Sequence, residues 1–110
     1  MQNMEIEKNV LDFQHKLAET QNKNSEVLKI LNEIKSSSLK SKLSNSELSY
    51  LEKLVDVYSK YAVVLLDMVN MSVTSWGRES NSYISVLDEI SHATTSALKE
   101  LIFLQEGLNK

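Results

Sequence analysis

The chain has no cysteine and no proline, and only two of its 110 residues are glycine. Without cysteine it can form neither a disulfide framework nor a thiolate zinc site, and it carries no thiol nucleophile. All-β and α/β domains turn often and use glycine and proline to do so. The scarcity of both residues therefore predicts an all-α protein, and the length predicts a single helical domain over residues 1–110.

The chain also lacks a basic excess and a targeting segment. Its formal net charge is −3, which argues against a nucleic-acid-binding protein. The N-terminus has no basic start followed by an apolar run, so we expect no secretory signal peptide. The most apolar stretch, residues 61–73, is shorter than the about 17–25 residues that cross a bilayer. We expect a cytoplasmic protein, with export independent of a signal peptide as the alternative.

Apolar residues recur every three or four positions in three segments, a heptad pattern typical of helices and coiled coils. The first segment, about residues 4–35, carries Ile6, Val10, Phe13, Leu17, Thr20, Asn24, Val27, Leu31 and Ile34. The second, about residues 45–76, carries Leu48, Leu51, Val55, Tyr58, Ala62, Leu65, Val69, Ser72 and Trp76. The third, about residues 80–108, carries Tyr83, Leu87, Ile90, Thr94, Ala97, Leu101, Leu104 and Leu108.

The two breaks between these segments predict the topology. Residues 36–45 are rich in serine, which weakens helices, so we expect a loop with one helical turn. Ser44 and Glu47 fit a capping box at the start of the second helix, and Gly77 is a typical helix end. Short connections predict an elongated up-down-up three-helix bundle. In the alternative, the last two helices run on through Gly77 and the long helical hairpin dimerises into a four-helix bundle.

If the helices pack antiparallel with the chain reversing at these two breaks, the polar or small residues of the three stripes come to the same level along the bundle axis. Thr20 and Asn24 then meet Tyr58, which meets Thr94. A buried amide costs free energy unless it forms hydrogen bonds, and a single buried Asn can fix helix register. We expect Asn24 to bond Tyr58 or Thr94 and this polar layer to set the register. The alternative is an Asn24 that lies at a partly wet edge.

The second segment carries a further apolar stripe, and it offers the best functional lead. This stripe consists of Leu54, Val57, Tyr61, Val64, Met68 and Met71. The third helix could cover it, or part of it could stay exposed as a groove or dimer face, since flexible Met side chains suit adaptable helix-binding surfaces. The candidate partner or dimer interface is therefore formed by Val57, Tyr61, Val64, Met68 and Met71.

Little in the sequence points to catalysis. Glu89 and His92 have the Glu-x-x-His spacing of di-iron helices, Asp12 and His15 form a similar pair, and Asp67 lies at a similar height. Because these positions lie beside or away from the apolar stripes, a metal-binding bundle is only a remote alternative, and no cofactor or metal is predicted. A slim three-helix bundle should fill its own interior, which leaves no pocket. We therefore expect no enzyme activity.

The pattern favours a helical protein–protein interaction module, such as a secretion chaperone, adaptor, immunity protein or inhibitor. Its partner would be another protein or a second copy in a homodimer. The competing class is a membrane-active or membrane-resting protein that uses the second helix and the face from Leu98 to Leu104. The net negative charge argues against that class, because helices that lie on membrane surfaces are usually rich in Lys or Arg.

Overall fold

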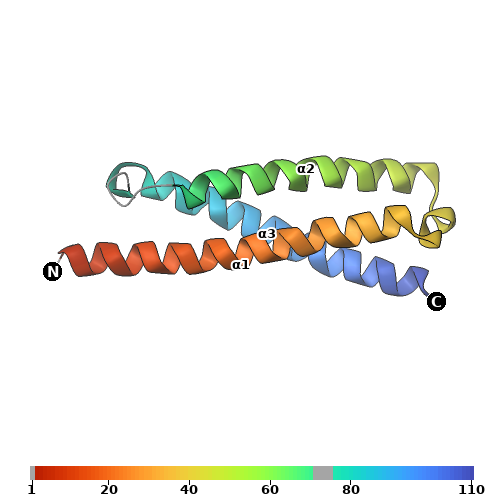
Figure 1. The fold of residues 1–110 in the computed structure, drawn as a ribbon, viewed down its shortest axis with the longest axis horizontal. Coiled ribbons are helices and arrows are strands. Elements are labelled where there is room, and N and C mark those ends of the chain that lie inside the picture. The colour runs from red at the N-terminus through yellow and green to blue at the C-terminus, as the bar shows by residue number, and fades with distance from the viewer. Residues whose placement is uncertain (1, 71–75) are drawn as a thin grey trace.

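The chain folds into three long helices joined by short connections (Figure 1). The computed structural model describes the backbone of residues 2–70 and 76–110, and the side chains of residues 8–70 and 81–110. Helix α1 spans Gln2–Ser36, the 3-10 helix η1 spans Ser38–Lys42, α2 spans Asn45–Val69 and α3 spans Trp76–Leu108. Helix α2 runs antiparallel to α1, and α3 runs parallel to it. The result is the expected up-down-up bundle, a rod with extents of 58 × 21 × 17 Å.

The connection between α1 and α2 follows the sequence closely. The predicted helical turn is η1, and Leu43 after it is buried against the bundle. The predicted capping box is present: the Glu47 amide donates to Ser44 Oγ at 3.1 Å, and the Ser44 amide donates to Glu47 Oε1 at 3.0 Å. These two bonds satisfy amides that the first turn of a helix leaves free. The hydrogen bond from the Ser44 amide lowers the pKa of Glu47, so its carboxylate stays ionised at neutral pH.

The connection between α2 and α3 lies before Gly77, whereas the sequence predicted it at Gly77. Helix α2 ends at Val69 rather than near residue 76, and its C-cap is Asn70, whose side-chain amide donates to the Leu66 carbonyl. Asparagine competes for backbone hydrogen bonds in this way and weakens helix continuation. Trp76 and Gly77 lie in the first turn of α3, which begins before the predicted residue 80. A glycine costs a helix only about 1 kcal/mol and need not end it. Because the chain reverses between α2 and α3, the continuous-hairpin alternative is wrong.

Helix α1 is the centre of the bundle, since it contacts both α2 and α3 along its length, whereas α2 and α3 touch at few points. Three contacts between α1 and α3 join residues 72 positions apart. They are the Lys16–Asp88 ion pair, the Lys23–Thr95 hydrogen bond and the Gln105–Glu33 hydrogen bond. A constant offset means that the parallel pair keeps one register from end to end.

The buried apolar residues form two clusters along the rod. The Phe13 cluster contains Phe13, Leu17, Leu65, Met68, Leu87 and Ile90. The η1 cluster contains Val27, Ile30, Leu31, Ile34, Leu43, Leu51, Tyr58, Ala97 and Leu101. Over their described parts, none of the three helices has an apolar stretch long enough to cross a membrane.

Candidate functional site: a groove between α2 and α3

A buried polar layer separates the two clusters and is formed by Thr20, Asn24, Tyr58 and Thr94, each at most 5% exposed. The expected contact of Asn24 with Tyr58 is present: Asn24 Nδ2 donates to the Tyr58 carbonyl at 3.0 Å. Asn24 is therefore buried rather than at a wet edge. That the layer sets the register stays a prediction.

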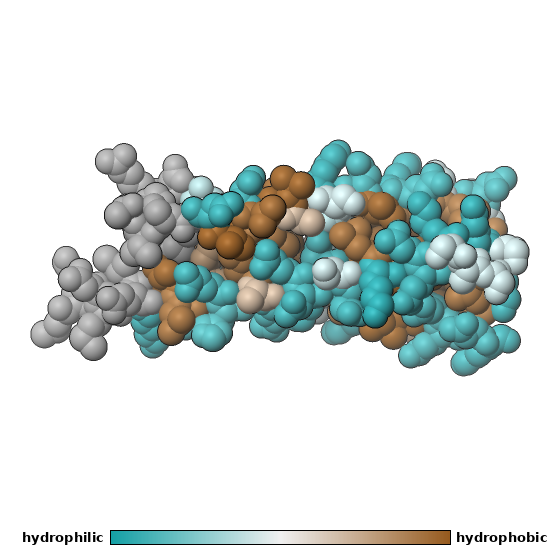
Figure 2. Space-filling view, in the orientation of Figure 1, coloured by the Kyte–Doolittle hydropathy of each residue, from teal (hydrophilic) through white to brown (hydrophobic). Residues whose placement is uncertain are grey.

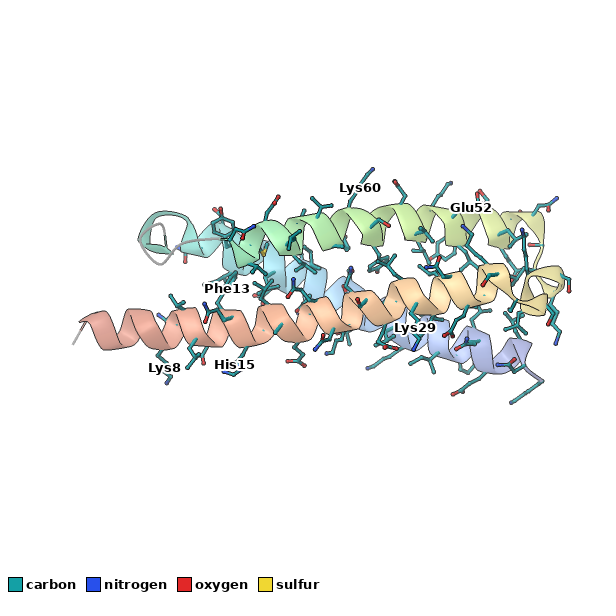
Figure 3. The ribbon with its side chains drawn as sticks, in the orientation of Figure 1. Lys8, Phe13, His15, Lys29, Glu52 and Lys60 are labelled. Carbon is teal, nitrogen blue, oxygen red and sulfur yellow. The ribbon has the colours of Figure 1, made fainter. Side chains whose placement is uncertain are left out.

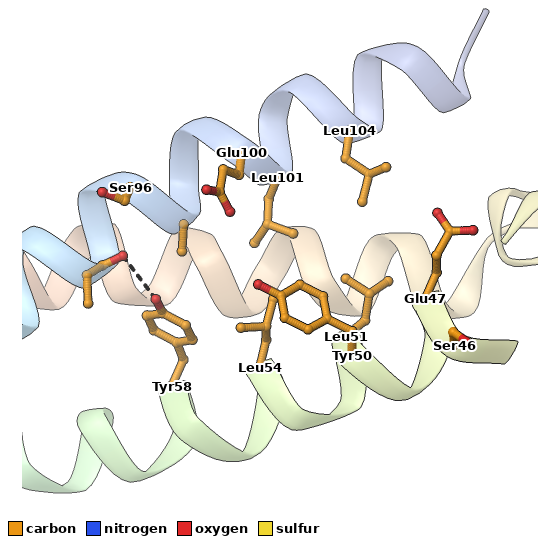
Figure 4. A pocket seen from close by; sticks show the side chains of 12 residues that line it. Ser46, Glu47, Tyr50, Leu51, Leu54, Tyr58, Ser96, Glu100, Leu101 and Leu104 are labelled. Atoms are coloured by element: carbon orange, nitrogen blue, oxygen red, sulfur yellow. Dashed lines mark hydrogen bonds between the residues drawn. The ribbon is translucent and has the colours of Figure 1, made fainter. Parts of the chain in front are cut away.

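Tyr58 links all three helices at this height. Its carbonyl accepts the hydrogen bond from α1, and its hydroxyl donates to the Ala93 carbonyl of α3 at 3.0 Å, the dashed line in Figure 4. Burial raises the pKa of the Tyr58 hydroxyl, and the nearby Tyr61, Tyr50 and Glu100 raise it further. The ring of Tyr61 meets that of Tyr58 edge-on, with centroids 5.2 Å apart. Tyr58 thus holds α2 at a fixed distance from α3.

The layer is not fully satisfied. Within the described part of the chain, Asn24 Oδ1 and Thr94 Oγ1 are buried side-chain atoms that have no hydrogen-bond partner. A buried polar atom left without a partner costs about 1–3 kcal/mol. The layer therefore holds the helices together through Asn24 Nδ2 and Tyr58 Oη, and loses part of that stabilisation to the two unpaired oxygens.

Beyond Tyr58, toward the C-terminus of α3, α2 and α3 diverge and leave an apolar groove (Figure 4). The groove has a volume of about 470 Å³. Its α2 wall is formed by Ser46, Glu47, Tyr50, Leu51, Leu54 and Tyr58, and its α3 wall by Ala93, Ser96, Ala97, Glu100, Leu101 and Leu104. The size lies within the range of about 300–1,000 Å³ that is usual for ligand sites.

The expectation that the bundle fills its own interior is therefore wrong, and the side-chain sizes explain why. The α3 wall presents Ala93, Ser96 and Ala97 in succession, which are too short to reach α2. The α2 wall presents aromatic rings, and the Tyr58 hydroxyl meets the α3 backbone rather than a side chain. The Tyr58 ring keeps α2 and α3 apart, and the small side chains of α3 do not fill the space between the two helices.

Two carboxylates are the charged groups among the described residues that line the groove. Glu47 comes from the first turn of α2, and Glu100 comes from the opposite wall on α3. In the described part of the chain neither takes part in an ion pair; the pairs are Lys16–Asp88, Lys23–Glu19 and Lys60–Asp56. The groove is therefore apolar inside and acidic at its edges.

The predicted interface residues divide between core and surface. Met68 is 3% exposed and belongs to the Phe13 cluster, so it cannot contribute to an exposed face. Tyr61 is half-buried and packs against both clusters. Val57 and Val64 are 39% and 36% exposed. Met71 lies outside the described residues. The predicted stripe is thus partly covered, as one reading of the sequence allowed.

The exposed part of this stripe lies on the same side of α2 as two residues of the groove wall. Tyr50, Leu54, Val57, Tyr61 and Val64 follow one another at spacings of four and three, which places them on one side of α2. Tyr50 and Leu54 line the groove, whereas Val57 and Val64 lie on the same side of α2 outside the lining and are exposed. Sequence reasoning found this side of α2 but missed the α3 wall, where the run of small residues was the available signal.

The Asp-x-x-His and Glu-x-x-His pairs lie on the surface of the bundle. Asp12, His15, Glu89, His92 and Asp67 are all exposed, and His15 points away from the bundle while Phe13 points into it (Figure 3). Nowhere in the described residues do three His, Asp or Glu side chains gather as metal ligands would. Asp12 borders a small hollow that is also lined by Lys16 and Asp88, which form an ion pair with each other.

A second apolar surface covers the second half of α2 (Figure 2). It includes Val63, Leu66 and Val69, all more than half exposed. This surface is convex, whereas the groove is hollow and offers two walls to an occupant.

The chain was compared with protein-family models, with curated proteins and with solved structures, and none of them matches it. The groove must therefore be interpreted from its own geometry and chemistry.

Proposed function

We propose that this protein is a non-enzymatic interaction module that binds a helical segment of another protein in the groove between α2 and α3. The observation that carries the proposal is the apolar hollow of about 470 Å³ between two diverging helices. Its walls are mostly apolar with a few polar groups, as is usual for binding sites. The groove does not favour any one of secretion chaperone, adaptor, immunity protein or inhibitor over the others.

The shape of the groove suits a helix. An amphipathic helix in a groove places apolar anchors at positions i, i+3, i+4 and i+7. The groove walls offer Leu51, Leu54, Leu101 and Leu104 for such anchors to pack against. Each Leu-sized anchor that becomes fully buried contributes about 1.5–3 kcal/mol. Val57 and Val64 extend the contact past Tyr58.

The lining chemistry supports binding rather than catalysis. Ser46 and Ser96 are the hydroxyl nucleophile candidates among the described residues of the groove, and no histidine lines it. A serine nucleophile needs an adjacent base to activate it. Both His15 and His92 are exposed and absent from the groove walls.

A groove-filling variant tests the proposal. Ser96 is exposed and lines the groove, so Ser96→Trp fills the hollow without removing a core contact. Ser85→Trp, on the exposed surface of the same helix and outside the groove, is the matched control. The probe is a neutral amphipathic peptide with a leucine stripe flanked by Gln and Ala, about 18 residues or 27 Å long.

We expect the peptide to shift backbone amide resonances of residues that line the groove. Ser96→Trp should weaken binding at least about tenfold, whereas Ser85→Trp should leave the affinity within about twofold of the parent. Circular dichroism checks that both variants keep the helical fold. Shifts that map away from the groove, or equal binding by both variants, would contradict the proposal.

A further inference from the structure

If the proposed function holds, the two carboxylates that line the groove indicate the charge of the helix that binds there. Its described lining carries two carboxylates, from opposite walls, and neither Lys nor Arg. Lys53 and Lys99 are the nearest cationic residues in sequence, but both are exposed and lie outside the groove lining. The groove thus presents an acidic surface to whatever enters it, in a chain whose net charge is already negative.

Both carboxylates are available to a partner. Glu47 accepts the Ser44 amide through Oε1, which holds the pKa of this carboxyl low. Among the described residues its other oxygen, Oε2, accepts no hydrogen bond. Glu100 is exposed and lines the α3 wall of the groove, and its negative charge makes the smallest contribution to the raised pKa of Tyr58. Figure 4 shows the carboxylate of Glu100 directed toward the space between the walls.

The apolar interior and the acidic edges require different features of one ligand. A helix fills the interior with its apolar stripe, and residues that flank the stripe then lie above the edges. Flanking carboxylates would be held close to Glu47 and Glu100, and like charges in contact are strongly unfavourable at an interface. Flanking cations would instead form charge-assisted hydrogen bonds with two carboxylates that take part in no ion pair within the described residues.

We infer that the groove binds an amphipathic helix of another protein whose apolar stripe is flanked by Lys or Arg. One cation meets Glu100 on the α3 edge, and a second meets Glu47 where α2 begins. A second copy of this chain fits less well, because each copy carries a net charge of −3 and would bring further negative charge to the acidic edges. Phe103, three residues beyond Glu100 and 78% exposed, offers an additional contact for a partner that extends over the outer side of α3.

Three peptides with the same leucine stripe test this inference. Their flanking positions carry Lys, Glu or the neutral Gln and Ala, and fluorescence anisotropy measures the affinity of each at low salt. Glu100→Lys reverses the charge on the groove edge. Glu106→Lys makes the same change on the same helix at an exposed residue outside the groove lining, and is therefore the matched control.

We expect the Lys peptide to bind about tenfold more tightly than the Glu peptide, with the neutral peptide between them. Glu100→Lys should reduce that ratio about fivefold or more, whereas Glu106→Lys should leave it within about twofold. Raising the salt concentration should reduce the preference for Lys, because exposed charges are screened.

The outcomes separate this inference from the function on which it rests. If all three peptides bind equally and Ser96→Trp weakens them all, the groove binds helices but the charge inference is wrong. If no peptide binds, both proposals fail. If sedimentation equilibrium shows a dimer that Ser96→Trp alone converts to a monomer, with Ser85→Trp as control, the occupant is a second copy and the inference is overturned.

Discussion

Three interfaces, here called seams, join the helices of the bundle in pairs. Side chains pack closely in the two seams that α1 forms with α2 and α3, whereas the seam between α2 and α3 opens into the groove beyond Tyr58, toward the C-terminus of α3. Along α1, branched aliphatic side chains such as Val27, Leu31 and Ile34 face both neighbours and are fully buried. Between α2 and α3, the small residues Ala93 and Ala97 line the same open groove as Tyr50 and Leu54. Both kinds of seam are built on heptad spacing, so periodicity alone does not decide which one closes. The sizes of the side chains that face each other decide it.

Truncation of one leucine in each kind of seam should break this contrast most clearly. Leu31→Ala removes a fully buried side chain from the η1 cluster and should lower the free energy of unfolding by about 2–5 kcal/mol. Leu54→Ala removes a half-buried side chain from the groove wall and should cost only about 1 kcal/mol. Urea denaturation measures both. Equal costs would mean that the third seam is as tightly packed as the other two.

The polar layer contains Asn24, whose side chain forms a hydrogen bond, and Thr94, whose hydroxyl forms none among the described residues. Substitutions of these two residues can therefore be compared directly. Asn24→Leu loses the hydrogen bond to the Tyr58 carbonyl and should lower the free energy of unfolding by about 1–2 kcal/mol. Thr94→Val keeps the shape and removes a buried oxygen that has no partner, so stability should stay the same or rise by about 1 kcal/mol. Denaturation midpoints compare the two. A more stable Asn24→Leu variant would show that the bond contributes little.

The link from Tyr58 to Ala93 is where the third seam changes from closed to open. Tyr58→Phe removes that hydrogen bond and should lower the free energy of unfolding by about 0.5–1.5 kcal/mol at neutral pH. The pKa of Tyr58 is raised in the folded protein. Its contribution is therefore complete below the unfolded pKa of about 10 and is lost as the pH rises through the folded pKa.

Urea denaturation at neutral and alkaline pH checks this sign. The difference between the parent and Tyr58→Phe should shrink as the pH rises, because the parent alone loses the contribution of Tyr58. Tyr50 and Tyr61 are common to both proteins and so cancel in the comparison. A difference that stays constant or grows with pH would contradict the role given to the hydroxyl group.

The sequence was sufficient for features that depend on one helix at a time. The stripes, the capping box at Ser44 and the height of the polar layer follow from spacing and local hydrogen bonding, and so they could be predicted. The end of α2 was placed too late, because Asn70 stops the helix before the more conspicuous Gly77 is reached. The groove could not be predicted from stripes, because it depends on which side chains of α2 and α3 come to line the same space after three helices have assembled.

Substitutions of the exposed valines of α2 should have the smallest effect on stability. They also test how far the binding surface extends along α2. Val57→Ser and Val64→Ser should each change the free energy of unfolding by less than about 0.5 kcal/mol, since both side chains are well exposed. If these residues extend the groove, each should weaken binding of the neutral leucine-stripe peptide about threefold. Val63→Ser, an equally small change on another side of α2, should alter neither quantity. Fluorescence anisotropy measures the peptide affinity, and urea denaturation measures the free energy of unfolding. If Val63→Ser lost as much affinity as Val57→Ser, the peptide would bind the convex apolar face of α2 rather than the groove.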